Sequence, residues 1–451
     1  MKKLLVLSLL LLSAFTWAQT YDYEINRFRE RVMISLNGKE DVATLTNAKI
    51  EIDRCSGLSA TKVYAYATPY EVERIIQMGF TVEPAPETIG NDSRTVAYHT
   101  YDTLTQELQS LAAQYPQLAK LESCGKSVQN RELWVLKISD NVAVDETEPE
   151  VKYISTMHGD EVVGMEMLVY LARYLLENYG KDSRITQLVN DLELWLMPDM
   201  NPDGTAAKRR YNANYVDLNR NFPDPQDDPN NTPTNRAIET QHLMKFTAAH
   251  VFCLSLNFHG GAVVVNYPWD TMAADIPDLA LTKFLSLGYS KLNTPMYNSS
   301  SFAKGVTNGY AWYEVNGGMQ DWNYYWYHDI DLTIEISQSK WPDASTLPQY
   351  WNDNRESLLW FMSQARRGVH GVVKEAGTGK ALRAEVNVTE INKPTFSHEI
   401  NGDYHRILMP GTYTIRYSAP GHQDVTFKNV TVADSDTQPT ILNVELPVTV
   451  K

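Results

Sequence analysis

Residues 151–161 read Val-Lys-Tyr-Ile-Ser-Thr-Met-His-Gly-Asp-Glu, an apolar strand-like run followed by a short polar loop. The apolar spacing of residues 165–179 predicts a helix directly after that loop. The loop therefore lies at the C-terminal end of a strand, which is where open α/β sheets place their sites. The spacing of His158 and Glu161 lets an imidazole and a carboxylate converge on one metal ion. Taken alone, His158 also fits a hydrogen-bonded structural histidine.

A second histidine, His259, strengthens the case for a metal site. It follows the apolar run 251–258 and precedes two glycines, so it also lies at the end of a predicted strand. Two strand-end imidazoles and one carboxylate form the three-ligand set of a catalytic zinc ion and leave one position for water. A closed structural site needs a fourth protein ligand, and none is evident in the sequence.

The α/β alternation extends across the central part of the chain. Further strands are predicted at 132–138, 192–197 and 332–336, and helices at 104–115 and 352–367. This pattern predicts an α/β domain over residues 94–367, with apolar strands filling a central sheet covered by helices.

The two flanking segments have different patterns. Residues 19–93 include a strand at 62–68, a helix at 69–78 and a linker with prolines and a glycine from 84 onward, which predicts a small α+β domain. Residues 368–451 contain short strands separated by Gly- and Pro-containing turns, which predicts an all-β sandwich. These short strands are predicted at 369–374, 385–389, 404–408, 413–417, 425–432 and 441–446.

A polar segment at residues 211–224 carries groups that can bind anions. Arg220 lies within this segment and Arg210 just before it. Both are always charged and can form bidentate hydrogen bonds with carboxylates or oxyanions. Asn219 adds amide donors. The alternative for such arginines is ordinary ion pairing at the surface.

Several of these segments closely resemble the zinc metallocarboxypeptidases, in the branch that contains carboxypeptidases N, E, D and M. The matching stretches, in family order, are 158–161, 201–204, 217–224, 257–261 with 266–268, 307–313, 317–321 and 333–335. The resemblance implies a central mixed sheet flanked by helices. The last 80 or so residues resemble the transthyretin-like sandwich that follows the catalytic domain in that branch.

The resemblance implies roles for individual residues. It assigns His158, Glu161 and His259 to one zinc ion per chain, and Glu335 to the general base that activates water. Arg210 matches the arginine that stabilises the carbonyl oxyanion. Asn219, Arg220 and Tyr313 match the clamp on the terminal carboxylate of the substrate, and Asp217 matches the carboxylate that orients a ligand histidine. The implied activity is removal of the C-terminal residue from peptides or proteins.

Specificity is predicted from residues that follow His259. Asp270 lies at the spacing where an acid in this branch forms the base of the pocket for the departing side chain, which predicts a preference for C-terminal Arg or Lys. Gln320 occupies a position that is apolar in the digestive enzymes that prefer aromatic ends, and a polar wall there disfavours such side chains. The alternative is that Asp270 is a solvated loop residue.

The N-terminus predicts export. Lys2 and Lys3 precede the apolar run 4–12, which is too short to span a bilayer and fits a signal peptide over residues 1–18. We therefore expect a secreted or periplasmic protein without a membrane span. The formal net charge of −15, without a basic run, makes nucleic acid an unsuitable partner. The three cysteines permit at most one disulfide and no Cys-based zinc site.

There are three alternatives to an enzyme that prefers C-terminal Arg or Lys. The same enzyme can have broad or neutral specificity, the fold can be a non-catalytic peptide-binding member, or the sandwich can make the protein an adhesion or scaffold module. Bound zinc and release of a C-terminal amino acid separate the first from the other two. The branch usually lacks a folded pro-segment, so residues 19–93 are open as an inhibitor, a folding aid or an accessory domain. The sequence carries no signal for an oligomeric state.

Overall fold

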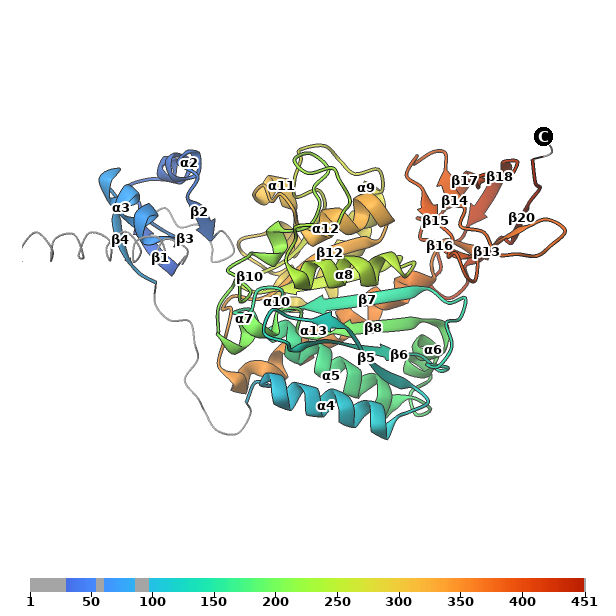
Figure 1. Cartoon of the computed structure of the whole chain (residues 1–451), viewed down its shortest axis with the longest axis horizontal. Coiled ribbons are helices and arrows are strands. Elements are labelled where there is room, and N and C mark those ends of the chain that lie inside the picture. Colours follow the sequence, from blue (N-terminus) through green and yellow to red (C-terminus); the bar gives the residue numbers. More distant parts are fainter. Residues whose placement is uncertain (1–29, 54–60, 86–96, 450–451) are drawn as a thin grey trace, which may run out of the picture. The chain divides into compact units, whose positions relative to one another are not determined.

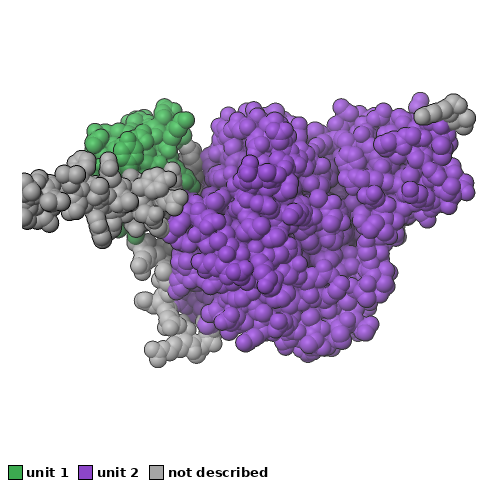
Figure 2. Space-filling model, in the orientation of Figure 1, with its two compact units in different colours: residues 1–88 green, residues 89–451 purple. Residues whose placement is uncertain are grey.

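The computed structural model describes residues 30–53, 61–85 and 97–449 (Figure 1). The chain divides into two compact units, residues 1–88 and 89–451 (Figure 2). The predicted signal peptide at 1–18 and most of the predicted linker lie outside the described residues. The domain boundaries predicted at 93/94 and 367/368 stay predictions.

Within residues 30–53 and 61–85, the first unit is a four-stranded antiparallel sheet with two helices. The sheet order is β2-β3-β1-β4, with β1 Glu30–Ser35, β2 Glu51–Asp53, β3 Lys62–Ala67 and β4 Thr81–Pro84. The helices are α2 Glu40–Asn47 and α3 Pro69–Gln77. Thr68 caps α3 by accepting from the amide of Glu71, whose side chain accepts from the amide of Thr68 in return. Its small apolar core and its element order confirm the predicted α+β pattern.

The second unit is built on an eight-stranded mixed sheet, as predicted. Its order is β11-β10-β12-β9-β7-β8-β6-β5. The strands are β5 Ala119–Lys126, β6 Glu132–Ile138, β7 Glu150–Ser155, β8 Glu193–Met197, β9 Leu254–His259, β10 Ala262–Tyr267, β11 Val306–Asn308 and β12 Ile330–Ser337. The central strands β8, β7, β9 and β12 run parallel, so their C-terminal ends meet at one edge of the sheet.

Alternate residues of the central strands face two separate cores. Tyr153 and Leu196 join the core formed with α4 Tyr101–Gln114, α5 Val163–Asn178, α6 Ser183–Asp191, α9 Leu279–Leu292 and α13 Leu347–Ser363. Ile154 and Met197 face the opposite core, which contains α8 Ile238–Ala248. The central strands are therefore buried along their whole length, because both faces of the sheet are covered.

The C-terminal part of this unit is a sandwich of two four-stranded sheets. One sheet contains β13 Val369–Glu375, β16 Asp403–Arg406, β19 Thr440–Ile441 and β20 Val444–Leu446. The other has the order β15-β14-β17-β18, with β14 Glu385–Val388, β15 Thr395–Phe396, β17 Gly411–Ser418 and β18 Val425–Val432. Their inward side chains form one core. The strand predicted at 441–446 is in fact two, because β13 pairs first with β19 and then with β20.

Two further observations concern membrane spans and cysteines. Among residues 30–53, 61–85 and 97–449, no helix is long and apolar enough to cross a membrane. Cys124 and Cys253 are free thiols, and Cys55 lies outside the described residues.

Candidate metal centre and active site

The three predicted metal ligands come together at the C-terminal edge of the central sheet. His158 and Glu161 lie in the loop between β7 and α5, and His259 is the last residue of β9. Because β7 and β9 are paired neighbours, the two strand ends bring these residues side by side. Nδ1 of His259 lies 3.0 Å from Nδ1 of His158 and 2.8 Å from Oε2 of Glu161.

The donor set fits a zinc ion. One ligand atom from each of the three residues lies within 4.8 Å of the others, and all three side chains are buried. Two imidazoles and one carboxylate are the protein ligands of a catalytic zinc site. Burial lowers the pKa of His259 to about 4, so its ring is in the neutral form that binds metals.

Lys340, which sequence reasoning missed, lies beside the carboxylate ligand. Its Nζ is 3.0 Å from Oε1 of Glu161, and its side chain is 2% exposed. Burial opposes the charge of Glu161, but Lys340 and His158 hold the pKa of this carboxyl well below its ordinary value. Glu161 therefore stays ionised and ready to bind a cation.

Asp217 links the metal centre to Arg210. Its Oδ1 lies 3.0 Å from Nε2 of His158, and its Oδ2 accepts from Nε of Arg210 at 2.9 Å. Burial opposes ionisation of Asp217, yet Arg210 and His158 hold its pKa well below the ordinary value. A carboxylate at the outer nitrogen of a ligand histidine sets its tautomer and orientation, which is the predicted role.

Arg210 itself lies against the metal centre. Its Nη1 is 3.1 Å from Nδ1 of His158 and 3.5 Å from Oε1 of Glu161. A buried guanidinium at this position can stabilise negative charge that develops next to the metal.

Glycines explain the close contact between two of the sequence motifs. A Cβ on Gly159 would collide with the backbone of Gly204, so the loop that carries His158 rests directly on the start of the short helix α7 Pro202–Ala206. The side chain of Asn201 holds both segments by donating to the carbonyl groups of Met157 and Arg210.

Glu335, the predicted base, is placed by strand register. It lies on β12 opposite His259 of the parallel neighbour β9, and its side chain is buried. Register partners in adjacent strands point to the same face of a sheet, so the carboxylate lies on the same side as the metal ligand.

The predicted clamp residues lie on two separate segments of the catalytic part. Asn219 and Arg220 belong to the 3₁₀ turn Leu218–Arg220, and Oδ1 of Asn219 accepts from the amide of Met319. Arg220 donates from Nη1 to the carbonyl of Asn219 at 2.9 Å. Tyr313 is half-buried at the end of α11 Gly309–Trp312 and packs on Trp312.

Asp270 is buried, with 4% exposure, and not a solvated loop residue. Burial raises its pKa to about 6, against the lowering effects of the hydrogen bond from Asn266 and the charge of Arg220. A Cβ on Gly309 would collide with Oδ1 of Asp270, so this glycine makes room for the carboxylate. Asp321 accepts the amides of Asp270 and Thr271, and holds the loop in place.

Among the residues that the structure describes, the side-chain amides of Asn266 and Gln320 each have one atom that accepts or donates no hydrogen bond. Asn266 donates from Nδ2 to Oδ1 of Asp270, and Gln320 accepts from the amide of Thr333 through Oε1. Within the described part of the chain, Oδ1 of Asn266 and Nε2 of Gln320 are buried without a hydrogen-bond partner. Buried polar atoms are normally paired with protein, water or a ligand, so both atoms are free to take a further partner. The sequence singled out Gln320 but assigned no role to Asn266.

Comparison with known proteins identifies this arrangement. A model of the zinc carboxypeptidase family matches residues 104–357. The chain is 35% identical over 398 residues to the catalytic chain of carboxypeptidase N from Homo sapiens, covering 78% of this chain and 86% of that protein. The chain belongs to the zinc carboxypeptidase family.

Other relatives of this member of the zinc carboxypeptidase family agree with the predicted branch. It is 44% identical over 361 residues to carboxypeptidase D from Mus musculus, covering 74% of this chain and 26% of that protein. The match to carboxypeptidase SOL1 from Arabidopsis thaliana is 41% identical over 341 residues, covering 74% of this chain and 69% of that protein. The chain thus spans about a quarter of the length of its carboxypeptidase D relatives.

Solved structures confirm the fold. Carboxypeptidase A from Helicoverpa armigera matches with a TM-score of 0.59 at 17% identity, covering 75% of this chain and 98% of that one. Thrombin activatable fibrinolysis inhibitor matches with the same TM-score at 16% identity, covering 74% of this chain and 98% of that one. The mixed sheet and its helices are therefore the carboxypeptidase fold, and the zinc of the family fits His158, Glu161 and His259.

Proposed function

We propose that this chain is an active carboxypeptidase that removes single residues from the C-termini of peptides or proteins, with a preference for Arg and Lys. The observation that carries the proposal is the convergence of the ligands His158, Glu161 and His259, with Glu335 in register beside His259. Family membership supports the reaction class.

The reaction needs a water activated next to the scissile carbonyl. When bound, zinc polarises that carbonyl and makes water acidic enough to attack near neutral pH. Glu335 accepts the proton of the attacking water and passes it to the departing amine. Arg210, held by Asp217, donates to the oxygen that becomes negative during attack.

Recognition of a free C-terminus makes the enzyme an exopeptidase. Arg220 pairs with the terminal carboxylate of the substrate through its fork of donors, while Asn219 and Tyr313 supply further hydrogen bonds. The turn that carries Asn219 is fixed, because Asp217 accepts from its amide and its own side chain accepts from Met319. A peptide bond in the middle of a chain offers no terminal carboxylate for Arg220 to bind.

We expect the side chain of the departing residue to lie beside Asp270. Its carboxylate and Oδ1 of Asn266 are acceptors, which suits the donors of a guanidinium or ammonium group. Gln320 does not add to this preference, because its unpaired atom Nε2 is a donor and a basic side chain offers no acceptor. We expect a basic end to gain roughly 2–5 kcal/mol from its pairing with Asp270.

The test is amino-acid release from matched peptides that differ only in their last residue. Peptides ending in Arg or Lys should be cleaved more than about tenfold faster than those ending in Leu or Phe. Chelation should abolish release and added zinc should restore it. Equal rates for all four ends point to broad specificity, and zinc binding without release indicates a peptide-binding protein.

We also propose that the chain is exported, on the basis of the signal peptide predicted at residues 1–18. Expression of the full chain in a bacterial host with intact export should yield a mature protein that begins close to residue 19. Intact-mass measurement of the periplasmic and medium fractions tests this. An unprocessed chain confined to the cytoplasm contradicts it.

A further inference from the structure

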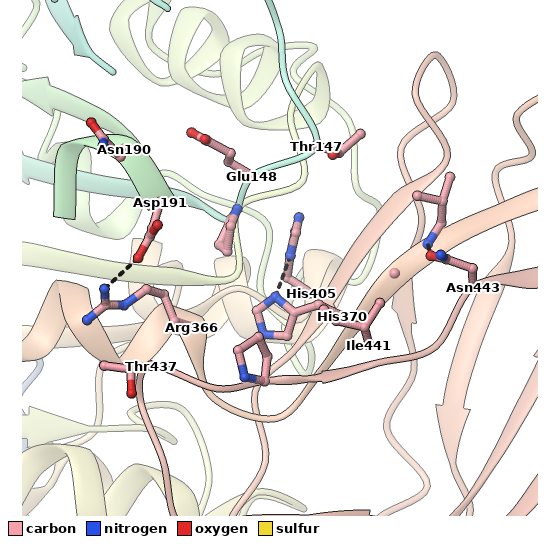
Figure 3. Close-up of a pocket in the computed structure, with 14 residues that line it drawn as sticks. Thr147, Glu148, Asn190, Asp191, Arg366, His370, His405, Thr437, Ile441 and Asn443 are labelled. Carbon is pink, nitrogen blue, oxygen red and sulfur yellow. Dashed lines mark hydrogen bonds and ion pairs between the residues drawn. The ribbon is translucent and has the colours of Figure 1, made fainter. Parts of the chain in front are cut away.

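The sandwich contains a pair of buried histidines far from the metal centre in sequence. His370 on β13 and His405 on β16 are direct partners in an antiparallel register. Their Nδ1 atoms lie 2.8 Å apart, and each residue is 5% exposed. Figure 3 shows the two rings next to each other, with a dashed line between these nitrogens.

The outer nitrogens of both rings are already used as donors. Nε2 of His370 is 2.8 Å from the carbonyl oxygen of Arg367, and Nε2 of His405 is 3.2 Å from Oδ2 of Asp403. A carbonyl or carboxylate oxygen only accepts, so each Nε2 carries a proton. In the neutral form of the rings each Nδ1 holds a lone pair, and the two lone pairs face each other.

This geometry calls for a positive species between the rings. Burial, and then the neighbouring His405, lower the pKa of His370 to about 3, so its ring is neutral near neutral pH. Two facing lone pairs repel unless a proton or a metal ion lies between them. Neutral imidazole is the form that binds zinc, copper and nickel.

A similar pair of rings occurs at the metal centre of this chain, where Glu161 is a third ligand. There the rings of His158 and His259 have centroids 4.7 Å apart and an interplanar angle of 62°, with Nδ1 atoms 3.0 Å apart. The rings of His370 and His405 have centroids 4.8 Å apart and an angle of 68°. In both places a carboxylate lies at the outer nitrogen of one ring, Asp217 in the first and Asp403 in the second.

A cavity beside the pair provides room for further ligands. It has a volume of about 480 Å³ and is lined by residues of both the catalytic part and the sandwich, including Glu148, Asp191, His370 and His405. Figure 3 shows this lining. Water molecules that enter the cavity can complete the coordination of an ion held by two imidazoles.

We propose that His370 and His405 form a second metal site, which binds a divalent transition-metal ion such as zinc through their Nδ1 atoms, at the junction of the sandwich and the catalytic part. Asp403 and the carbonyl of Arg367 orient the two rings. The site is independent of the catalytic centre, so its test does not depend on the proposed activity.

Metal stoichiometry of the full chain tests the site. Protein equilibrated with micromolar free zinc should hold two ions per chain by elemental analysis, against one if only the catalytic centre binds. His370→Gln and His405→Gln should each hold one, because the amide nitrogen of Gln replaces the Nε2 donor but not Nδ1. His259→Gln should also hold one, and the double variant His259→Gln/His370→Gln none.

His422→Gln is the matched control, since His422 belongs to the same sandwich and contacts Glu375 instead of a second histidine. It should keep two ions. Circular dichroism confirms that each variant is folded.

A measurement on the unmodified chain does not depend on any variant. Anomalous diffraction at the zinc edge from crystals grown with zinc should show one peak at the catalytic centre and one about 2.0–2.1 Å from both Nδ1 atoms. A single ion per chain, with no peak between His370 and His405, overturns the proposal and leaves a shared proton between the rings.

Discussion

Glu335 and His259 are direct partners in the register of two neighbouring parallel strands, β12 and β9. A strand register cannot shift by one residue without turning a buried side chain to the other face of the sheet. The central sheet is covered on both faces, so this register is strongly constrained. The position of the proposed base relative to a metal ligand is therefore set by the core of the protein.

Glu335→Gln should keep zinc and slow turnover by at least ~10³-fold, because the amide has nearly the same size but cannot take a proton from water. Elemental analysis measures the zinc, and release of C-terminal Arg measures turnover. Glu445→Gln, at an exposed position of β20, is the matched control and should leave turnover unchanged. Turnover within about tenfold of the unmodified enzyme shows that another group acts as base.

Asp217→Ala should weaken zinc binding by about 10–100-fold, because it removes the hydrogen bond that orients His158. It also releases Arg210, so turnover at saturating zinc should fall as well. Competition with a chelator of known affinity measures the first effect, and turnover measures the second. Asp424→Ala, an exposed acid of the sandwich, should change neither. Unchanged zinc affinity in Asp217→Ala argues against an orienting role.

The sequence predicted the ligands well because each follows an apolar run at the end of a strand. His158 and His259 share that signal, and parallel strands then bring their ends to one edge. Glu335 carried a weaker signal: the run 332–336 predicts a strand but not which strand is its neighbour. Its role came from the family resemblance, and the pairing of β12 with β9 supplies the physical reason for its position.

Residues that act through long-range contacts were not predictable. Lys340 follows a short polar stretch that resembles a solvated turn, and only the fold brings its Nζ to Glu161. Asn266 lay in a matched motif, but its unpaired Oδ1 beside Asp270 depends on how the pocket folds. The pairing of His370 with His405 likewise requires the register between β13 and β16, which the spacing of the two residues does not determine.

Asp270→Asn should remove most of the preference for basic ends and leave zinc in place. Asn has the same shape but no charge, so the ratio of kcat/KM for Arg-ended over Leu-ended peptides should fall by more than about tenfold. Asp275→Asn, exposed and five positions further along the chain, is the matched control and should keep the ratio. If Asp270→Asn keeps the same ratio of kcat/KM, another residue determines the preference for basic ends.

The preference for basic ends should depend on pH through Asp270. Burial raises its pKa to about 6, so the carboxyl is neutral below this pH and ionised above it. The ionised fraction of such a group rises about tenfold between roughly pH 5 and pH 7. The ratio of kcat/KM for Arg-ended over Leu-ended peptides should rise accordingly, since titrations shared by both substrates cancel. In Asp270→Asn the ratio should be flat with pH, and a flat ratio in the unmodified enzyme contradicts the assignment.

Arg406→Met should destabilise the chain strongly, because Arg406 joins the sandwich to the catalytic part through a buried ion pair. Its Nη2 lies 2.9 Å from Oδ1 of Asp278, and the side chains are 0% and 1% exposed. Removing one partner of a buried pair costs about 3–5 kcal/mol, because the other charge stays buried. Urea denaturation measures the loss. Arg416→Met breaks an exposed pair with Glu385 in the same sandwich and should cost about 0–1 kcal/mol.

The effect of Arg406→Met should shrink in acid, and the sign follows from Asp278. Burial opposes ionisation of this carboxyl, but Arg406 and His328 hold its pKa well below the ordinary value. An acid with a lowered pKa in the folded state adds stability above its unfolded pKa of about 4 and loses it as the pH falls further. The difference in unfolding free energy between the unmodified chain and Arg406→Met should therefore narrow below about pH 4. Arg406→Met/Asp278→Asn should recover part of the loss at neutral pH, because no buried charge is left without its partner. A difference that is constant with pH, together with no recovery in the double variant, means that packing and not charge accounts for the role of Arg406.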